Sequence, residues 1–101
     1  TDNPWRSYFL SFSDEGVFIA GGKSQGIEEG SNFVVKQRGD KVKNPQTGIM
    51  IELPGKIVGQ VTVTTSIGNS PEHEMSRVSY KGDTIDSENL SNYYIEEDLE
   101  K

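Results

Sequence analysis

Few residues of this chain have the types and spacing that site chemistry requires. Glu72, His73 and Glu74 offer three potential metal ligands in a row. In a strand the side chain of His73 would point away from both glutamates, because successive side chains alternate between two faces. The chain has one histidine and no cysteine, so neither zinc nor thiolate chemistry is expected. The sequence offers no set of converging titratable groups for a hydrolase. It predicts a protein that is not an enzyme and holds no metal or cofactor.

A glycine-rich corner lies between two apolar runs and has some likeness to a phosphate cradle. A phosphate-binding loop needs Gly-x-x-x-x-Gly-Lys-Ser/Thr followed by a helix, whereas here Phe33, Val34 and Val35 indicate a strand. Glycine adopts positive φ without a Cβ clash. We therefore interpret Gly26 and Gly30 as structural turn residues at a corner of a small barrel.

Four basic residues gather in one polar segment. Lys36, Arg38, Lys41 and Lys43 form this cluster, and they are the candidate interaction residues. They would meet an acidic protein surface, an anionic glycan or the acidic tail of this chain; the simpler interpretation is a solvated loop. A specific hypothesis is that residues 96–98, Glu-Glu-Asp, fold back on this loop. Exposed ion pairs contribute only about 0–1 kcal/mol each, so such a contact would be loose and sensitive to salt.

Charge is unevenly distributed along the 101 residues. The net charge is −6, and residues 86–101 contain six acids and one base, which leaves −1 for residues 1–85. A nearly neutral body lacks the density of Lys and Arg that phosphate contacts need, so no nucleic-acid partner is expected. The apolar runs are far shorter than the ~20 residues of a membrane helix. Because the chain begins with Thr1, we expect a piece of a longer protein, with any membrane tether in a region outside this chain.

Two-residue periodicity and turn residues predict six short strands. Arg38 to Gly48 is too polar for a strand and is interpreted as a long hairpin loop, in which Pro45 and Gly48 are structural turn residues. Gly59, within the longest strand, predicts a bulge or a bend. The expected strand ranges are Trp5–Phe12, Val17–Ala20, Asn32–Gln37, Ile49–Leu53, Lys56–Ile67 and Glu74–Lys81.

The expected core is aliphatic and aromatic. Leu10 and Phe12 share one face of the first strand with Tyr8, and Phe9 lies opposite. Trp5 joins these rings in a core or barrel-plug role, in preference to a stacking platform for nucleic acid. The predicted core residues are Leu10, Phe12, Val17, Ile19, Ile27, Phe33, Val35, Ile49, Ile51, Ile57, Val61, Val63 and Val78.

Short strands joined by Gly, Pro and Asn turns predict an all-β fold, a small antiparallel SH3-like β-barrel of five to six strands. The barrel domain is expected to span residues 1–85. Residues 86–101 form an acidic tail, for which the sequence leaves two alternatives. One is a short helix that begins near Glu88 and carries Leu90, Tyr94 and Ile95 on one side. The other is a disordered tail, since isolated short helices are marginal in water.

Four motifs follow one another across residues 5–80. They are Val17-Phe18-Ile19, the segment from Ser24 to Val35, Val42-Lys43-Asn44-Pro45-Gln46-Thr47-Gly48, and Ile57-Val58-Gly59-Gln60-Val61-Thr62-Val63. In this order the chain resembles the small C-terminal SH3-like domain of the flagellar assembly protein T. It is also similar to the domain appended to curli-assembly-type (CsgG-like) lipoproteins of the bacterial envelope.

The resemblance implies an SH3-like barrel in the periplasm or at the outer membrane, with neither catalysis nor a cofactor. We therefore expect a non-enzymatic protein-interaction or structural module of a bacterial envelope lipoprotein or periplasmic protein. Its partners would be other envelope-assembly proteins. The alternative is a glycan- or peptidoglycan-binding module that uses Trp5 and Tyr8, or Tyr93 and Tyr94, as exposed ring platforms.

Overall fold

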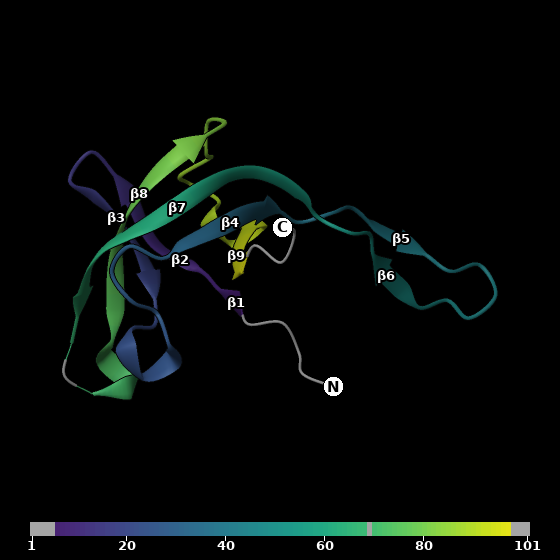
Figure 1. The fold of residues 1–101 in the computed structure, drawn as a ribbon. Helices are drawn as coiled ribbons and strands as arrows, with labels where there is room; N and C mark the ends of the chain where they lie inside the picture. Colours follow the sequence, from purple (N-terminus) through teal and green to yellow (C-terminus); the bar gives the residue numbers. More distant parts are fainter. Residues whose placement is uncertain (1–5, 69, 98–101) are drawn as a thin grey trace.

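The chain is all-β, and one antiparallel sheet curls into a nearly closed barrel (Figure 1). The computed structural model describes residues 6–68 and 70–97. The seven-stranded sheet has the order β1-β9-β4-β7-β8-β3-β2, and two further strands form a separate ribbon. The strands are β1 (Arg6–Ser7), β2 (Phe9–Ser13), β3 (Gly16–Ala20), β4 (Asn32–Gln37), β5 (Lys41–Lys43), β6 (Met50–Glu52), β7 (Lys56–Ile67), β8 (Met75–Gly82) and β9 (Tyr93–Glu97). Short 3₁₀ turns lie in the connections as η1 (Lys23–Gln25), η2 (Pro71–His73) and η3 (Leu90–Asn92).

The sheet closes because its two outermost strands are one stretch of chain bent at Tyr8. β1 pairs with β9, where Ser7 lies opposite Ile95, whereas β2 pairs with β3 at the other side of the sheet. At the bend, the amide of Ala20 donates to the carbonyl of Tyr8 (3.0 Å). The Ser7 hydroxyl donates to the carbonyl of Ala20 (2.6 Å). The all-β, antiparallel prediction is confirmed, although the barrel sheet has seven strands where five to six were expected.

Two strands predicted from the sequence, Asn32–Gln37 and Lys56–Ile67, are neighbours in the middle of the barrel sheet. β4 and β7 have the predicted bounds and pair antiparallel. On β7, Val61 and Val63 are buried and Gln60 is exposed, as alternation requires of a strand with one dry face. The predicted irregularity near Gly59 is confirmed, because the β4–β7 register shifts between Val35 and Lys36, where the partners on β7 are Gly59 and Ile57.

The core contains many of the expected side chains, and four expectations are wrong. Leu10, Ile49, Ile51 and Ile57 are all between 45% and 62% exposed. In β2 the register shifts between Phe9 and Ser11, so Phe9 is buried and Leu10 faces outward. The buried cluster comprises Phe9, Ile19, Ile27, Phe33, Val35, Val58, Val61, Val63, Val78, Ile85, Tyr93 and Ile95, with Phe12, Val17, Tyr80 and Leu90 packed against it.

The prediction of a helical or disordered segment after residue 85 is wrong for residues 93–97. These residues form β9, which lies inside the sheet between β1 and β4. Tyr93, Tyr94 and Ile95 are buried, and η3 precedes them as a single turn. The sheet therefore extends beyond the expected domain boundary at residue 85. Residues 98–101, the end of the predicted tail, lie outside the described part of the chain.

Three glycines expected at turns adopt the left-handed backbone that favours this residue. Gly26 has φ +82°, Gly30 +89° and Gly48 +76°. The Gly26–Gly30 segment delivers the chain into β4, since the amide of Gly30 donates to the carbonyl of Val63 on β7 (2.8 Å). The corner thus connects β3 to β4, which lie apart in the same sheet.

Candidate interaction site

A two-stranded ribbon projects from the barrel and is the main candidate for an interaction site. We call residues 38–55, which comprise β5, β6 and their connections to the barrel, the arm (Figure 1). β5 and β6 pair antiparallel, with Val42 opposite Ile51 and Lys43 opposite Met50. The expectation of a loop from Arg38 to Gly48 is therefore wrong for Lys41–Lys43, which form a strand. Ile49–Leu53 was expected in the barrel, and its strand lies in the arm instead.

The turn at the tip of the arm has the chemistry expected from its sequence. The amide of Asn44 donates to the carbonyl of Ile49 (2.9 Å), and the amide of Gly48 donates to the carbonyl of Asn44 (2.8 Å). Asn44 Oδ1 also accepts the amide of Gln46, as asparagine does at the start of many turns. Pro45 lies within this turn. These bonds fix the register of the ribbon.

The register gives the arm one apolar face and one charged face. Residues directly opposite each other share a face, so Val42 and Ile51 lie together. The next pairs on that face add Ile49 and Leu53, together with their polar partners Asn44 and Asp40. The four aliphatic side chains are 42%, 45%, 62% and 43% exposed, in that order. We call Val42, Ile49, Ile51 and Leu53 the apolar face. Lys41, Lys43, Met50 and Glu52 lie on the opposite side.

An isolated two-stranded hairpin is marginally stable in water, because it has no core of its own. The four side chains of the apolar face are exposed, and both outer edges of the ribbon are free of strand partners among the described residues. Unpaired edges invite other strands, and lysines such as Lys41 and Lys43 resist indiscriminate pairing. The arm thus has the features of a surface that a partner covers.

The base of the arm is held against the barrel by Arg38. Its Nε donates to the carbonyl of Ser91 (2.9 Å), and its Nη1 lies 3.7 Å from Oε2 of Glu52, on β6. The guanidinium also lies 5.3 Å from the ring centre of Tyr94. Gly55 allows the chain to pass this ring, since a Cβ there would lie 2.5 Å from the Tyr94 hydroxyl.

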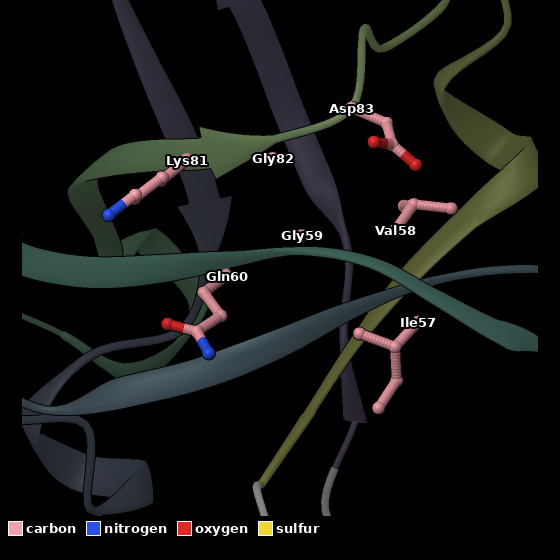
Figure 2. Close-up of a pocket in the computed structure, with 7 residues that line it drawn as sticks. All are labelled: Ile57, Val58, Gly59, Gln60, Lys81, Gly82 and Asp83. Atoms are coloured by element: carbon pink, nitrogen blue, oxygen red, sulfur yellow. The ribbon is translucent and has the colours of Figure 1, made fainter.

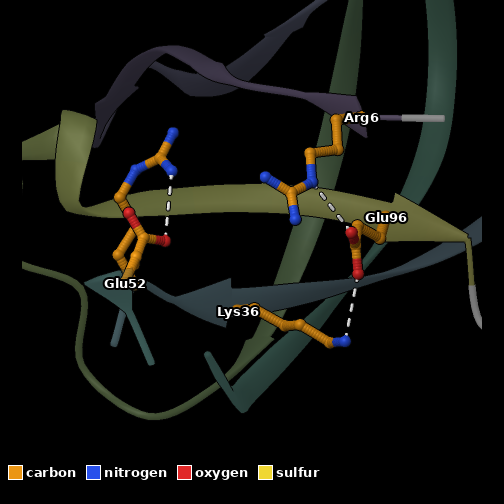
Figure 3. A network of polar contacts seen from close by, with 5 residues as sticks. Arg6, Lys36, Glu52 and Glu96 are labelled. Carbon is orange, nitrogen blue, oxygen red and sulfur yellow. Dashed lines mark hydrogen bonds and ion pairs between the residues drawn. The ribbon is translucent and has the colours of Figure 1, made fainter. Parts of the chain in front are cut away.

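A charge network lies beside this base on the outer wall of the barrel (Figure 3). Glu96 of β9 accepts a hydrogen bond from Nε of Arg6 (2.9 Å) and pairs with Nζ of Lys36 (3.0 Å). Burial by itself favours the neutral acid, but the bonds from Lys36 and Arg6 outweigh it and hold the pKa of Glu96 below its ordinary value. The hydrogen bond to Glu96 raises the pKa of Lys36 in turn. The network joins β1, β9 and β4 across the closure of the barrel.

The four predicted interaction residues do not form one patch. Lys36 lies on the barrel wall and is paired with Glu96, and Arg38 anchors the arm. Lys41 and Lys43 are exposed on the arm itself. Glu96 of the predicted tail does pair with one residue of this cluster, Lys36. It does so as part of strand β9, and not as a loose tail folded back on a loop. Asp98 lies outside the described residues.

The sequence reasoning missed the apolar face of the arm. A signal was present, because Ile49, Ile51 and Leu53 alternate with Met50 and Glu52. The alternation was interpreted as a barrel strand with a buried face. Periodicity predicts that one face of a strand is apolar. It does not determine whether another part of the same chain covers that face.

A shallow hollow of about 450 Å³ lies between the ends of β7 and β8. Gly59 and Gly82 lie opposite each other there, and the Tyr80 ring occupies the space that a Cβ of Gly59 would need. Figure 2 shows that Lys81 and Asp83 extend in different directions from the rim. The hollow therefore gathers no pair of groups suited to proton transfer among the residues that line it.

The expectation that the sequence holds no Gly-x-Ser-x-Gly motif is wrong, because Gly22-Lys23-Ser24-Gln25-Gly26 has this spacing of a nucleophile elbow. That elbow is a strained turn from a strand into a helix, whereas Ser24 lies in the single turn η1 and no described residue other than glycine has positive φ. Its hydroxyl donates to Oε1 of Glu74 (2.8 Å), which also accepts the Ser24 amide. The contact ties η1 to the start of β8.

The potential metal ligands around His73 are not assembled. Nδ1 of His73 lies 2.8 Å from the Ser70 hydroxyl, and Glu74 is engaged with Ser24. In the described part of the chain, no group of three or more His, Cys, Asp or Glu side chains is placed to hold a metal ion. Nor does any helix within residues 6–68 and 70–97 have the length and apolar character to cross a membrane.

The ring platforms expected for a glycan are mostly not at the surface. Tyr93 and Tyr94 are 6% and 4% exposed, so the expectation that this pair forms an exposed ring platform is wrong. Tyr8 is exposed and lies near Arg38. Trp5, its expected partner, lies outside the described residues.

No known protein family, curated protein or solved structure matches this chain. The architecture and the contacts described above are therefore the basis for assigning a function.

Proposed function

We propose that this protein is a non-enzymatic protein-interaction module in which the barrel is the rigid base and the arm is the docking element. One observation carries the proposal: the four aliphatic side chains of the apolar face lie exposed on a ribbon that projects from the barrel. Chains seldom present such a face on an extended element unless a partner covers it.

The energetics of the arm agree with reversible docking. Full burial of one aliphatic side chain contributes roughly 1.5–3 kcal/mol. The four side chains are each about half exposed, so covering them would contribute on the order of 4 kcal/mol. Free ladder groups along the edges of β5 and β6 add backbone hydrogen bonds if the partner supplies a strand.

The anchoring of the arm supports the same proposal. Arg38 bonds to the η3 turn and pairs with β6, and Gly55 packs beside Tyr94. These contacts hold the base of the arm in one direction relative to the barrel, which lowers the conformational entropy that a partner must remove on binding.

We further propose that this docking takes place in the bacterial envelope, with other envelope-assembly proteins as partners. This part of the proposal is supported by the sequence resemblance to the C-terminal domain of the flagellar assembly protein T and to curli-assembly-type lipoproteins. Cell fractionation of the natural host tests it directly: recovery of the protein in the cytoplasm would contradict the envelope assignment.

Site-specific photo-crosslinking tests the docking proposal in cells of the natural host. A photoreactive residue placed at Ile51, in the apolar face, should give adducts with a discrete partner. The matched control carries it at Ser79, an exposed position on β8 of the barrel wall. Equal adducts from both positions, or none from Ile51, would contradict a docking role for the arm.

A further inference from the structure

We propose that the outer face of strands β4, β7 and β8 binds a polyanionic polysaccharide, one whose sugars carry carboxylate or sulfate groups. This inference goes beyond the proposed function, because the surface lies on the barrel wall and not on the arm. It follows from the distribution of charged and polar side chains over the sheet and from the hollow at one end of this face.

Acidic residues are absent from four neighbouring strands of the barrel sheet. β4, β7, β8 and β3 follow one another in the sheet, and together they contain four bases and no Asp or Glu. The rest of the chain contains six bases and sixteen acids, for a net −10. A chain that is acidic overall therefore has one wall on which positive charge prevails.

The strand register places polar side chains together on the outer face of this wall. Thr62 of β7 lies opposite both Asn32 of β4 and Ser79 of β8. The neighbours of Thr62 and Ser79 in the sequence, such as Val61 and Val78, are buried in the core on the other face. Residues two positions apart on a strand share a face, which adds three further side chains. We call Asn32, Gln60, Thr62, Arg77, Ser79 and Lys81 the polar wall.

The two cations of the polar wall are available to a ligand. Within residues 6–68 and 70–97, no carboxylate forms an ion pair with Arg77 or Lys81, and both side chains are exposed. The Nη2 of Arg77 donates to the backbone carbonyl of Glu15 (3.1 Å), and the guanidinium lies 5.9 Å from the ring centre of Phe18. Arg77 and Lys81 are four residues apart on one strand, which corresponds to about 13 Å. An extended anionic chain could therefore contact both.

The other two bases of these strands contribute less to this face. Lys36 lies on the outer side but is paired with Glu96 of β9 (3.0 Å). Lys56 precedes Ile57, the partner of Lys36 in the sheet, so it lies on the other face. The ligand would therefore be held mainly by β8. Exposed charge pairs are individually weak, so binding should be reversible and sensitive to salt.

The hollow between β7 and β8 lies at one end of the polar wall. Gln60 and Lys81 both line it, and Figure 2 shows them on adjacent strands beside Gly59 and Gly82. Its volume of about 450 Å³ is within the range of small-molecule sites. The two glycines have no side chain, which allows a ligand to approach the backbone closely. The carboxylate of Asp83, also in the lining, can accept hydrogen bonds from sugar hydroxyls.

The chemistry of the polar wall favours a polysaccharide over other polyanions. The Ser79 hydroxyl and the Gln60 amide both donate and accept hydrogen bonds, as sugar hydroxyls require. Single-stranded nucleic acid is held largely by bases that stack on aromatic rings, and none of the six residues of the polar wall is aromatic. Protein partners usually need an aromatic or apolar anchor at the centre of the interface, and the polar wall contains none.

Amide chemical shifts of the full chain, measured by NMR at low ionic strength, test the inference. The probes are alginate, which carries carboxylates, heparin, which carries sulfates, and dextran, which is neutral. With a polyanion, the shifts should change at Gln60, Ser79 and Lys81 and should stay unchanged in the arm. The changes should disappear at about 1 M salt, where the Debye length is about 3 Å. Dextran should cause none, and a response to only one polyanion would identify the anionic group.

Two charge variants show whether the polar wall is the site. The wall variant, Arg77→Gln with Lys81→Gln, should lose about tenfold in affinity for the polyanion. The matched control, Lys41→Gln with Lys43→Gln, removes the same charge from exposed positions of the arm and should bind as wild type does. Urea unfolding of both variants should resemble that of wild type, because all four side chains are exposed.

Four results would overturn the inference. They are unchanged shifts with both polyanions, equal binding of dextran and alginate, equal losses in the wall variant and the arm variant, and tighter binding of oligothymidylate than of either polyanion. The last result would assign the wall to nucleic acid. Crosslinking from Ile51 tests the arm independently, so the proposed function can stand where this inference fails.

Discussion

Replacement of Glu96 by Gln should destabilise the barrel by about 1–2 kcal/mol at neutral pH. Glu96 holds Arg6 of β1 and Lys36 of β4 from the strand between them. Hydrogen bonds to charged groups contribute about 1.5–3 kcal/mol when shielded from water. The Arg6 and Lys36 side chains are 43% and 29% exposed, so solvent lowers this contribution toward that of surface pairs.

The pH dependence of this effect has a definite sign. The pKa of Glu96 is lower in the folded chain than its ordinary value of 4.5. A carboxyl group with a lowered pKa stabilises the fold above its unfolded pKa and loses that effect as pH falls through the folded value. The difference in unfolding free energy between wild type and Glu96→Gln should therefore be constant from pH 7 to about 5 and shrink below about 4.5.

Urea unfolding followed by far-UV circular dichroism, at several pH values, measures this difference. The matched control is Glu97→Gln, one residue further along β9 and exposed, which should change stability by less than about 0.5 kcal/mol. Two results would refute the conclusion that this network stabilises the closed barrel. One is a loss of unfolding free energy in Glu96→Gln that is as large at pH 3 as at neutral pH. The other is an equal loss in Glu97→Gln.

Four further substitutions test the packing. Phe33→Ala, in the core, should cost about 3–5 kcal/mol in chemical unfolding, while Ile57→Ala, at an exposed position, should cost less than about 1 kcal/mol; equal losses would contradict the placement of Phe33. Gly59→Ala places a Cβ 2.5 Å from the Tyr80 ring and should lower the melting temperature. In Gly30→Ala the new Cβ has open space around it, so the substitution should cost only the left-handed backbone strain of about 1–2 kcal/mol. A larger loss of stability in Gly30→Ala than in Gly59→Ala would argue against the placement of both glycines.

Local patterns in the sequence predict the barrel wall well. β7 is recognisable because valines alternate with polar residues along it, and β4 because the apolar run Phe33-Val34-Val35 follows a turn. The glycine corner before β4 is recognisable because few other residues adopt positive φ. These features depend on neighbours within a few residues. They can therefore be inferred without knowledge of which strands pair.

The features that were missed depend on distant parts of the chain. β9 is a short apolar run among acidic residues. Glu96 is tolerated in this strand only because pairing with β1 and β4 brings basic partners beside its carboxylate. The arm shows the opposite difficulty: Ile49 and Ile51 have the alternation of a core strand, yet they lie on the separate two-stranded ribbon and are exposed. Burial is a property of the assembled fold, so periodicity alone does not determine it.

The pairing of β1 with β9 also constrains how the protein is made. Arg6 and Ser7 lie opposite Glu96 and Ile95. The first strand therefore cannot pair until residues about ninety positions later in the chain have left the ribosome. Contacts between such distant residues slow folding, because a large loop must close before any of them is gained. During synthesis the strands made first would have edges without hydrogen-bond partners. A chaperone that covers these edges until β9 emerges would raise the yield of native protein.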